Sequence, residues 1–437
     1  MRKTGLFIIS FVFLLLCLSA CGKKEVSDNK DIVKNEKSKS DKSKEDKKSK
    51  PKKKKEARVE NNGGYFVGSD NLVYFRNSGE GLIGESALFG DFLTISKKGE
   101  NSQICSYDVD SGEVEVEFED SGFGEIYLHK DTFYLKEIDE ENEGVYGNIY
   151  SIKTDGSDRK DITQGNILAM NPENGVYAVE NYEDGVRLIE LWQGDEQIYS
   201  FKDDKDEHVA SFIESGHTDE YVLFLKNSYD ETEQPELWVL KLDEGSELKK
   251  IGDFDMEEED LSYSYPVIEQ VAYSKDMLYF ILALRSGTAS TLQGAYLFEA
   301  DLSEEDSLQL LDESVENGNE ETVLEIWLDE SGELKKGSHK PLSAWAYETD
   351  LMFCDEDENE KVLCPDLFAE DSDDNDMIKM MQKAEFVNGL FFVISCDARR
   401  YEEDDIGWRE AYKCFGTSYF CIPAEEGSQE EVIVSTE

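Results

Sequence analysis

A pattern of short aromatic and β-branched runs, separated by turns rich in Gly, Asp and Asn, recurs along most of this chain and narrows the folds open to it. The clearest copy spans residues 131–163, where Tyr150 and Ile152 alternate with polar neighbours. Such a period of two indicates strands with one buried face. Asp155 and Gly156 favour a tight hairpin turn, because both residue types tolerate positive φ. The copy predicts a strand, a loop, a second strand, a tight Asp-Gly turn and a third strand.

Looser copies keep the same order of strands. They occupy residues 72–118, 175–201, 220–251, 277–311, 350–368 and 389–434. Apolar anchors from Tyr74 to Phe391 recur about every 53 residues, and one four-stranded propeller blade takes ~40–50 residues. A single blade cannot bury both of its faces, whereas a closed ring gives every blade two neighbours. We predict an all-β β-propeller of about seven four-stranded blades, with six and eight blades still open.

Residues 321–337 are either a hairpin insertion or a degenerate eighth blade. We expect the ring to close by pairing the first ordered strand, near Gly64–Val67, with the blade built from residues 389–437. In that blade Glu431–Val434 reads as the outer strand. The alternative fold is a two-domain β-sandwich, because it produces the same local pattern.

The Gly147–Thr163 stretch reads G-x-I-Y-x-I-x-x-D-G-S-x-x-K-x-I-T. It resembles the repeats of bacterial lipoproteins that carry a propeller domain of unknown function. Those repeats are similar in style to TolB-type and low-density-lipoprotein-receptor YWTD propellers. The resemblance is close in this copy and loose in the others, and it implies the fold rather than a function.

Charge divides the chain into two parts with opposite balance. Residues 1–60 hold 18 Lys and Arg against 9 Asp and Glu, whereas residues 61–437 hold 27 against 90. The whole chain has a formal charge of −54. A nucleic-acid-binding protein neutralises phosphates with Lys and Arg, so the acidic part is not expected to bind nucleic acid. We expect residues 61–437 to form the acidic propeller domain.

Residues 1–20 have the order of a signal peptide. Arg2 and Lys3 precede a short apolar run, Leu6–Leu16, and small residues follow it. Leu18-Ser19-Ala20-Cys21 resembles the lipobox of bacterial lipoproteins, which implies a lipidated Cys21 thiol and cleavage before this residue. Acyl chains there would anchor the protein to the extracytoplasmic face of the cell membrane. An ordinary cleaved signal and a short transmembrane helix are the alternatives.

Residues 21–60 contain almost no apolar side chains, and Lys52–Lys55 are four lysines in a row. Such a segment cannot bury a core, so we predict a disordered, lysine-rich tether. Its basic charge either attracts anionic lipid or wall polymer, or only keeps a spacer solvated. A lysine-rich tether with Gly22 after the lipidated cysteine resembles lipoproteins of Gram-positive bacteria.

Six cysteines remain after processing besides Cys21. They are Cys105, Cys354, Cys364, Cys396, Cys414 and Cys421. Export permits disulfides, and free buried thiols are the alternative. A cross-strand Cys354–Cys364 bridge is one candidate, and one pair among the three cysteines of the last blade is another. A metal site is disfavoured because the sequence has no C-x-x-C motif.

No catalytic motif stands out in the sequence. The four histidines, His129, His208, His217 and His339, are scattered, and HExxH, G-x-S-x-G and Walker motifs are absent. The acidic run from Asp371 to Asp376 starts like a calcium loop. It has Asp376 where an EF-hand has Gly, and Gln382 in place of the last Glu, so at most a weak Ca²⁺ site is expected.

The five tryptophans are better explained by packing than by ligand stacking. Trp192 and Trp238 alternate with apolar neighbours in strands, and Trp408 is the one most expected to be exposed. The remaining two are Trp327 and Trp345.

We expect a membrane-anchored propeller that binds a protein, a peptide or another surface ligand without catalysis and without a cofactor. The charge of the acidic part favours a cationic partner. The alternatives are a cell-envelope hydrolase with its site in the central channel, and a scaffold for envelope assembly.

Overall fold

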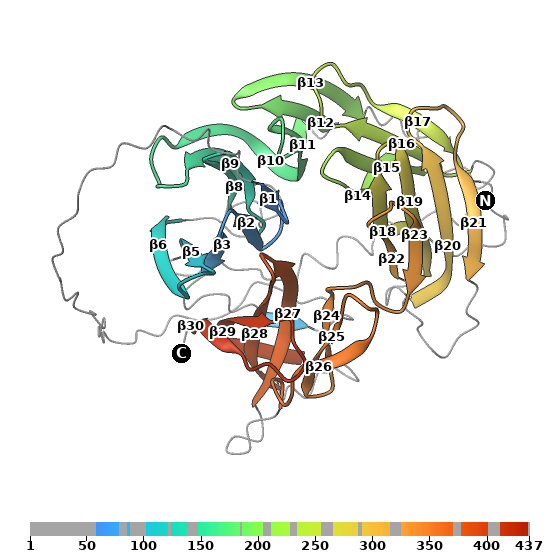
Figure 1. The fold of residues 1–437 in the computed structure, drawn as a ribbon. Coiled ribbons are helices and arrows are strands. Elements are labelled where there is room, and N and C mark those ends of the chain that lie inside the picture. Colours follow the sequence, from blue (N-terminus) through green and yellow to red (C-terminus); the bar gives the residue numbers. More distant parts are fainter. Residues whose placement is uncertain are drawn as a thin grey trace, which may run out of the picture. The chain divides into compact units, whose positions relative to one another are not determined.

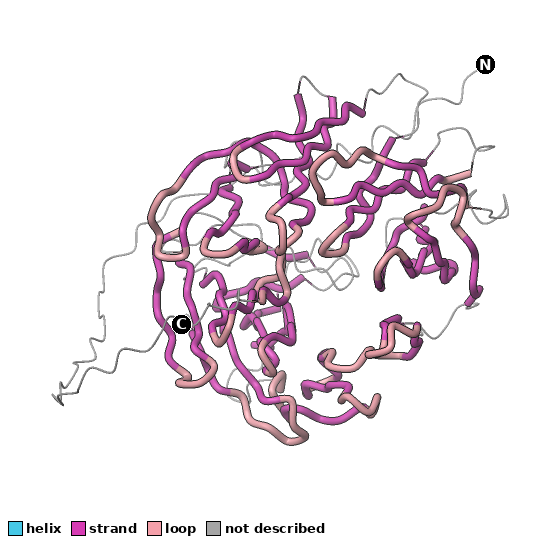
Figure 2. Tube along the Cα trace, turned by 45° about the horizontal axis from the view of Figure 1, so that its top comes forward, coloured by secondary structure: helices cyan, strands magenta, loops and turns pink. Residues whose placement is uncertain are grey.

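The structure, a computed structural model, describes residues 58–77, 85–87, 102–120, 124–138, 147–183, 186–203, 211–227, 234–254, 265–286, 291–314, 325–369, 377–400 and 411–435. The chain divides into two units, residues 1–54 and 55–437, and every described residue belongs to the second. The signal segment, Cys21 and most of the tether lie outside the described residues. The regular structure in the described part is all strand (Figure 2). None of it is a helix long and apolar enough to cross a membrane.

The strands pair with their sequence neighbours in antiparallel sheets. The first sheet contains β1 Val59–Glu60, β2 Phe66–Ser69, β3 Leu72–Asn77, β5 Gln103–Asp108 and β6 Glu113–Glu119. Next come β7 Tyr127–His129, β8 Thr132–Ile138, β9 Gly147–Lys153, β10 Lys160–Met170, β11 Val176–Glu183, β12 Val186–Gln193 and β13 Glu196–Asp203. Because β10 ends one four-stranded unit and begins the next, these seven strands form two units joined in one sheet.

Two four-stranded sheets, a hairpin, a three-stranded sheet and a last sheet follow. The four-stranded sheets are β14 Ser211–His217, β15 Tyr221–Asn227, β16 Glu236–Lys241 and β17 Lys249–Asp253, and β18 Tyr265–Ser274, β19 Met277–Ser286, β20 Thr291–Asp301 and β21 Gln309–Ser314. The hairpin is β22 Glu325–Leu328 and β23 Leu334–Gly337, and the three-stranded sheet is β24 Ala344–Tyr347, β25 Asp350–Cys354 and β26 Glu360–Cys364. The last sheet is β27 Met377–Val387, β28 Leu390–Arg400, β29 Ala411–Pro423 and β30 Glu431–Ser435, with β4 Glu85–Ala87 added beside β29.

Apolar clusters join most of the sheets face to face in chain order, and the last sheet packs on the first. Between β22–β23 and β24–β26 the described contacts are those of His339. At that closing junction the Phe66 and Phe392 rings lie 5.1 Å apart. Figure 1 shows β27–β30 beside β1–β3, although they are at opposite ends of the described chain. This closed series of stacked sheets is a β-propeller, which confirms the predicted fold class. The sequence copies correspond to the later strands of the sheets that they cover and leave out the first strand, which has between 2 residues, in β1, and 11, in β27.

The first hairpin of several sheets turns on two residues. Asp70, Lys130, Lys275 and Asn388 adopt positive φ there, as this turn type requires. The predicted tight turn at Asp155-Gly156 is present: the Gly156 N–H donates to the Lys153 carbonyl at 2.8 Å, and Gly156 has positive φ. It is not a two-residue hairpin, because the β9–β10 pairing resumes only at Ser151 and Lys160, and the Asp155 carboxylate accepts the Ser157 N–H at 2.9 Å between them.

The predicted strand pairing at the ring closure is also wrong. Phe66–Ser69 pairs with β1 and β3 rather than with the last sheet. The side chain of Glu385 on β27 bridges the junction instead, accepting N–H groups of Phe66 at 3.0 Å and Tyr65 at 3.3 Å and the Asn61 amide at 2.7 Å. Burial raises the pKa of Glu385. The prediction of β30 as an outer strand is confirmed.

Residues 325–337 form the β22–β23 hairpin as a separate two-stranded sheet. Its Ile326 packs against the β18–β21 sheet. On the other side, the His339 ring lies 3.5 Å from Glu325 and 3.9 Å from Glu360 and stacks on Trp345. The hairpin is therefore held by apolar packing on one side and by a histidine between two carboxylates on the other.

The disulfide prediction is not borne out for the described thiols: Cys105, Cys354, Cys364, Cys396 and Cys421 are buried, and none of them forms a disulfide. In the β25–β26 register Cys354 pairs with Glu360 and Cys364 with Leu351. That offset places the two cysteines roughly 10 Å apart along the strands, beyond disulfide reach. The side chain of Cys414 lies outside the described set.

Candidate functional site

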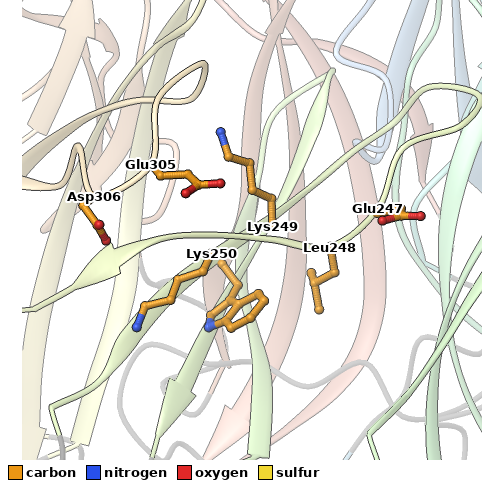
Figure 3. Close-up of a pocket in the computed structure, with 7 residues that line it drawn as sticks. Glu247, Leu248, Lys249, Lys250, Glu305 and Asp306 are labelled. Atoms are coloured by element: carbon orange, nitrogen blue, oxygen red, sulfur yellow. The ribbon is translucent and has the colours of Figure 1, made fainter.

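A cavity of about 540 Å³ lies between the β14–β17 sheet and the turn that follows β20. It is lined by Trp238, Glu247, Leu248, Lys249, Lys250, Glu305 and Asp306 (Figure 3). The walls come from the third and fourth strands of one sheet and from the β20–β21 turn of the next. This cavity is therefore at the outer part of the blades and not at their first strands, where a central-channel site was considered.

Trp238 is held in one orientation by a carboxylate two residues before it. Its indole N–H donates to Glu236 Oε2 at 2.8 Å, and the side chain packs on the apolar cluster between the β10–β13 and β14–β17 strands. Lys226 Nζ lies 2.9 Å from the same Glu236 oxygen and 5.6 Å from the centre of the indole ring. The tryptophan wall is thus fixed before any ligand arrives, which lowers the entropic cost of binding.

Glu236 is the centre of this network. Lys250 Nζ donates to Glu236 Oε1 at 2.9 Å and to Asp253 at 2.7 Å. Burial by itself would raise the pKa of Glu236, but the hydrogen bonds from Lys250, Lys226 and Trp238 outweigh it and lower the pKa to about 2. Although burial opposes its charge, the pKa of Lys250 is raised by Asp253 and Glu236. Both groups stay charged at neutral pH, so the network is a fixed ion-pair cluster.

Lys249, which alternates with Lys250 on β17, reaches across to the neighbouring sheet. Its ammonium donates to the carbonyls of Leu302 at 3.1 Å and Glu304 at 3.3 Å. The same turn is organised by Asp301, which accepts the Ser303 N–H at 2.9 Å. Lys249 therefore fixes the turn that carries the opposite rim of the cavity.

The two walls approach closely at a glycine. A Cβ on Gly252 would lie 2.8 Å from the Leu308 Cβ, which is closer than real Cβ contacts allow. Only glycine lets this part of β17 meet the β20–β21 turn without a shift of the backbone. The spacing of the cavity walls therefore depends on this residue.

Three exposed carboxylates stand at the rim: Glu247, Glu305 and Asp306. Among the described residues none of them has a hydrogen-bond or ion-pair partner, whereas both lining lysines are engaged. Figure 3 shows Lys249 and Lys250 pointing to opposite sides of β17, with Glu305 on the side of Lys249. The lining side chains offer an aromatic face, carboxylates and ammonium groups, which suit recognition of a charged ligand. The described lining includes no hydroxyl, thiol or imidazole group.

The other residues considered from sequence are dispersed. Cys21, the 371–376 acidic run, His208 and Trp408 lie outside the described residues. His129 Nδ1 lies 2.9 Å from the Pro172 carbonyl, and His217 is on β14, so the described histidines do not gather with the cavity. The described part holds no group of three or more His, Cys, Asp or Glu side chains arranged to bind a metal ion.

The sequence predicted that Trp238 packs between blades, and in the structure it both packs there and lines the cavity. The charged residues around Trp238 were not predicted as site residues. A signal was present: Glu-Leu-Trp occurs at residues 190–192 and again at 236–238. Trp192 likewise donates its indole N–H to Glu190, at 3.2 Å. Within the described part of the chain, Glu190 has no lysine contact of the kind that Glu236 has, and burial raises the pKa of Glu190. The motif marks a pinned tryptophan, but only the fold shows which one faces a cavity.

No protein-family model matches this chain, and no curated protein sequence matches it. Among solved structures, it is similar to the β-propeller domain of the Trilobed protease from Pyrococcus furiosus (10% identity, 87% of this chain and 98% of that one, TM-score 0.42). It is also similar to an acylaminoacyl peptidase (8% identity, 86% of this chain, TM-score 0.39) and an oligogalacturonate lyase from Vibrio parahaemolyticus (11%, 72% of this chain and 83% of that one, 0.36). The chain spans about half, 52%, of the peptidase. At these identities the likeness says nothing about activity.

Proposed function

We propose that this protein is a lipid-anchored, extracytoplasmic propeller that binds a protein or peptide partner without catalysing a reaction. The observation that carries the proposal is the cavity beside Trp238, whose fixed indole and unpaired rim carboxylates provide recognition chemistry. The anchor rests on the lipobox at Leu18–Cys21, and the excess of 90 acidic over 27 basic residues in 61–437 favours a cationic partner.

The anchor is tested by fractionation of cells that express Cys21→Ser. We expect the variant to lose lipid labelling and membrane retention, because the thiol that carries the acyl chains is gone. A Cys17→Ser variant is the matched control, since Cys17 lies within the signal segment. Unchanged labelling and fractionation of Cys21→Ser would refute the anchor.

Binding is tested by crosslinking the full chain at the cell surface and recovering its partners. A saturable partner that is displaced by added salt supports the proposal. Turnover of cell-wall glycan or peptide substrates with no partner recovered would favour the hydrolase alternative instead.

A further inference from the structure

We propose that the outer edge of β6 pairs with an extended segment of the partner in which basic and apolar residues alternate. This inference rests on the proposed binding function, and it adds a surface on the first sheet that is separate from the cavity beside Trp238. Three observations carry it: the position of β6 in its sheet, the length of its regular edge, and the two different faces that its side chains form.

β6 is the outermost strand of the first sheet. Among the described strands it pairs only with β5, so no described strand pairs with the backbone groups along its other side. Figure 1 shows β6 on the outer side of β5, at the left of the view. The N–H and C=O groups of such an edge are already aligned, so the edge is a template for one further strand.

The regular part of this edge is longer than that of most other outer strands. β6 pairs without interruption from Glu113 to Val116, before a bulge at Glu117. In the outer strands β17, β21, β26 and β30, bulges leave runs of at most three paired residues. β13 has a longer run, but its Lys202 disfavours a basic partner and its Tyr199 packs on the neighbouring cluster. Because bulges disrupt pairing, β6 has the most suitable edge for a basic strand among the described outer strands.

The side chains of β6 form an apolar face and an acidic face. Val114 and Val116 share one face, because side chains alternate along a strand, and they are 36% and 55% exposed. Glu113 and Glu115 share the other face and are exposed as well. The side chains of a strand paired with β6 alternate in the same way, so this strand contacts both faces at once. Its apolar residues would lie beside the valines and its basic residues beside the glutamates.

The charge of β6 favours a basic partner over a second copy of this chain. Two β6 edges paired antiparallel would place glutamates opposite glutamates, and like charges in that position are destabilising. Natural edge strands use charged side chains in this way to prevent self-association. No Lys or Arg occurs in Glu113–Glu119, so a basic strand meets only acidic charge on β6.

The probe for this edge is a fluorescent heptapeptide in which Lys and Val alternate. It is titrated into the full-length chain in nonionic detergent micelles, and we expect saturable binding by fluorescence anisotropy. A peptide of the same composition, with its lysines and valines in two blocks, keeps the charge but loses the alternation, so it should bind about tenfold more weakly or less. A peptide that alternates Glu and Val should not bind, because its charge repels that of the edge. If the first peptide does not bind, or if the block peptide binds equally well, the proposal is overturned.

Two N-methylated forms of the alternating peptide test for backbone pairing. One form has methyl groups on the valine nitrogens and the other on the lysine nitrogens. Alternate N–H groups of a paired strand point to the same side, so we expect one form to lose about tenfold or more in affinity and the other to keep it. Equal affinities of the two forms would mean that the peptide does not add a strand, which also overturns the proposal.

Two double variants test the acidic face. Glu113→Gln/Glu115→Gln should weaken binding of the alternating peptide about fivefold, since each exposed cross-strand pair contributes only modestly. Glu425→Gln/Glu426→Gln is the matched control, because it removes two exposed charges from the turn between β29 and β30. This control should leave the affinity unchanged. Equal losses in the two variants would indicate general attraction to an acidic protein and would refute pairing at β6.

A photo-crosslinker at the centre of the peptide locates its binding site. We expect the crosslinks to map to β6. Crosslinks only to β21 or β30, where Leu310 and Val432 are also exposed, would overturn the proposal.

Recovery of partners from the cell surface separates this inference from the proposed function. A partner that crosslinks equally to the unchanged chain and to Glu113→Gln/Glu115→Gln overturns the inference but leaves the binding function standing. If the peptide binds β6 and the unchanged chain recovers no surface partner, it is the proposed function that fails.

Discussion

A buried ion pair in the first sheet, which Tyr150 of the next sheet also contacts, makes the sharpest prediction about stability. Arg76 Nε lies 2.6 Å from Asp120 Oδ2, and the two side chains are 5% and 0% exposed. The contact is an ion pair rather than a well-aligned hydrogen bond, because neither atom has a hydrogen-bond partner of good geometry. The guanidinium also donates to the Gly124 carbonyl at 3.2 Å, and the Tyr150 hydroxyl donates to the other Asp120 oxygen.

Asp120→Ala leaves the Arg76 charge buried without its partner. Removing one member of a buried pair costs about 3–5 kcal/mol, and the Tyr150 hydroxyl loses its acceptor at the same time, so we expect a loss of about 4 kcal/mol or more. Urea unfolding followed by tryptophan fluorescence measures this loss as a fall in the midpoint. In Arg76→Met/Asp120→Leu both charges are absent, so most of the stability should return.

The surface pair between Arg159 and Glu137 provides the control. These side chains are 40% and 32% exposed, and breaking an exposed pair with Glu137→Gln should cost about 1 kcal/mol or less. If Asp120→Ala costs no more than Glu137→Gln, or if the double variant is as unstable as Asp120→Ala, the explanation by an unpaired buried charge is refuted.

Three further predictions concern other parts of the propeller. The pKa of Glu236 falls to about 2 in the fold, so its stabilising contribution should be complete above the unfolded pKa near 4.5 and should vanish as the pH falls towards 2. The difference in unfolding free energy between the wild type and Glu236→Gln should therefore shrink over this pH window, and a constant difference would contradict the prediction. Gly165→Ala should lower the unfolding free energy by about 1–3 kcal/mol, because Gly165 has φ 148° and the new Cβ would lie 2.4 Å from the Glu180 carbonyl oxygen. Gly194→Ala is the control: the space around Gly194 is open, so this variant should lose less stability in the same unfolding assay. Burial raises the pKa of Cys105 and of Cys364 to about 12, so both thiols should react slowly with a thiol reagent at pH 8 in the folded chain and quickly in urea. Mass mapping of the labelled peptides measures both rates, and rapid labelling of the folded chain would contradict the burial of these thiols.

The sequence alone was sufficient for the strand pattern and for the fold class. Alternation such as that of Tyr150 and Ile152 is a local property, because each side chain faces the core or the solvent according to its place along one strand. The period of about 53 residues then required sheets that cover one another. The first strand of each sheet was not part of the predicted copies. Some of these strands, such as Tyr127–His129, have too few residues to show a period, but Tyr265–Ser274 and Met377–Val387 have 10 and 11 residues, so length does not explain all of the omissions.

What the sequence could not decide were the contacts between distant segments. At the ring closure Glu385 and Phe392 contact the first sheet, and β4 rather than Gly64–Val67 pairs with the last sheet; β25 and β26 pair in a register that separates Cys354 from Cys364. Such choices depend on how whole sheets pack. The same is true of the cavity: Glu-Leu-Trp pins an indole at both Trp192 and Trp238 by local hydrogen bonding. Only the close approach of Gly252 to Leu308, made by two neighbouring sheets, brings the β20–β21 turn with Glu305 and Asp306 to the edge of β17.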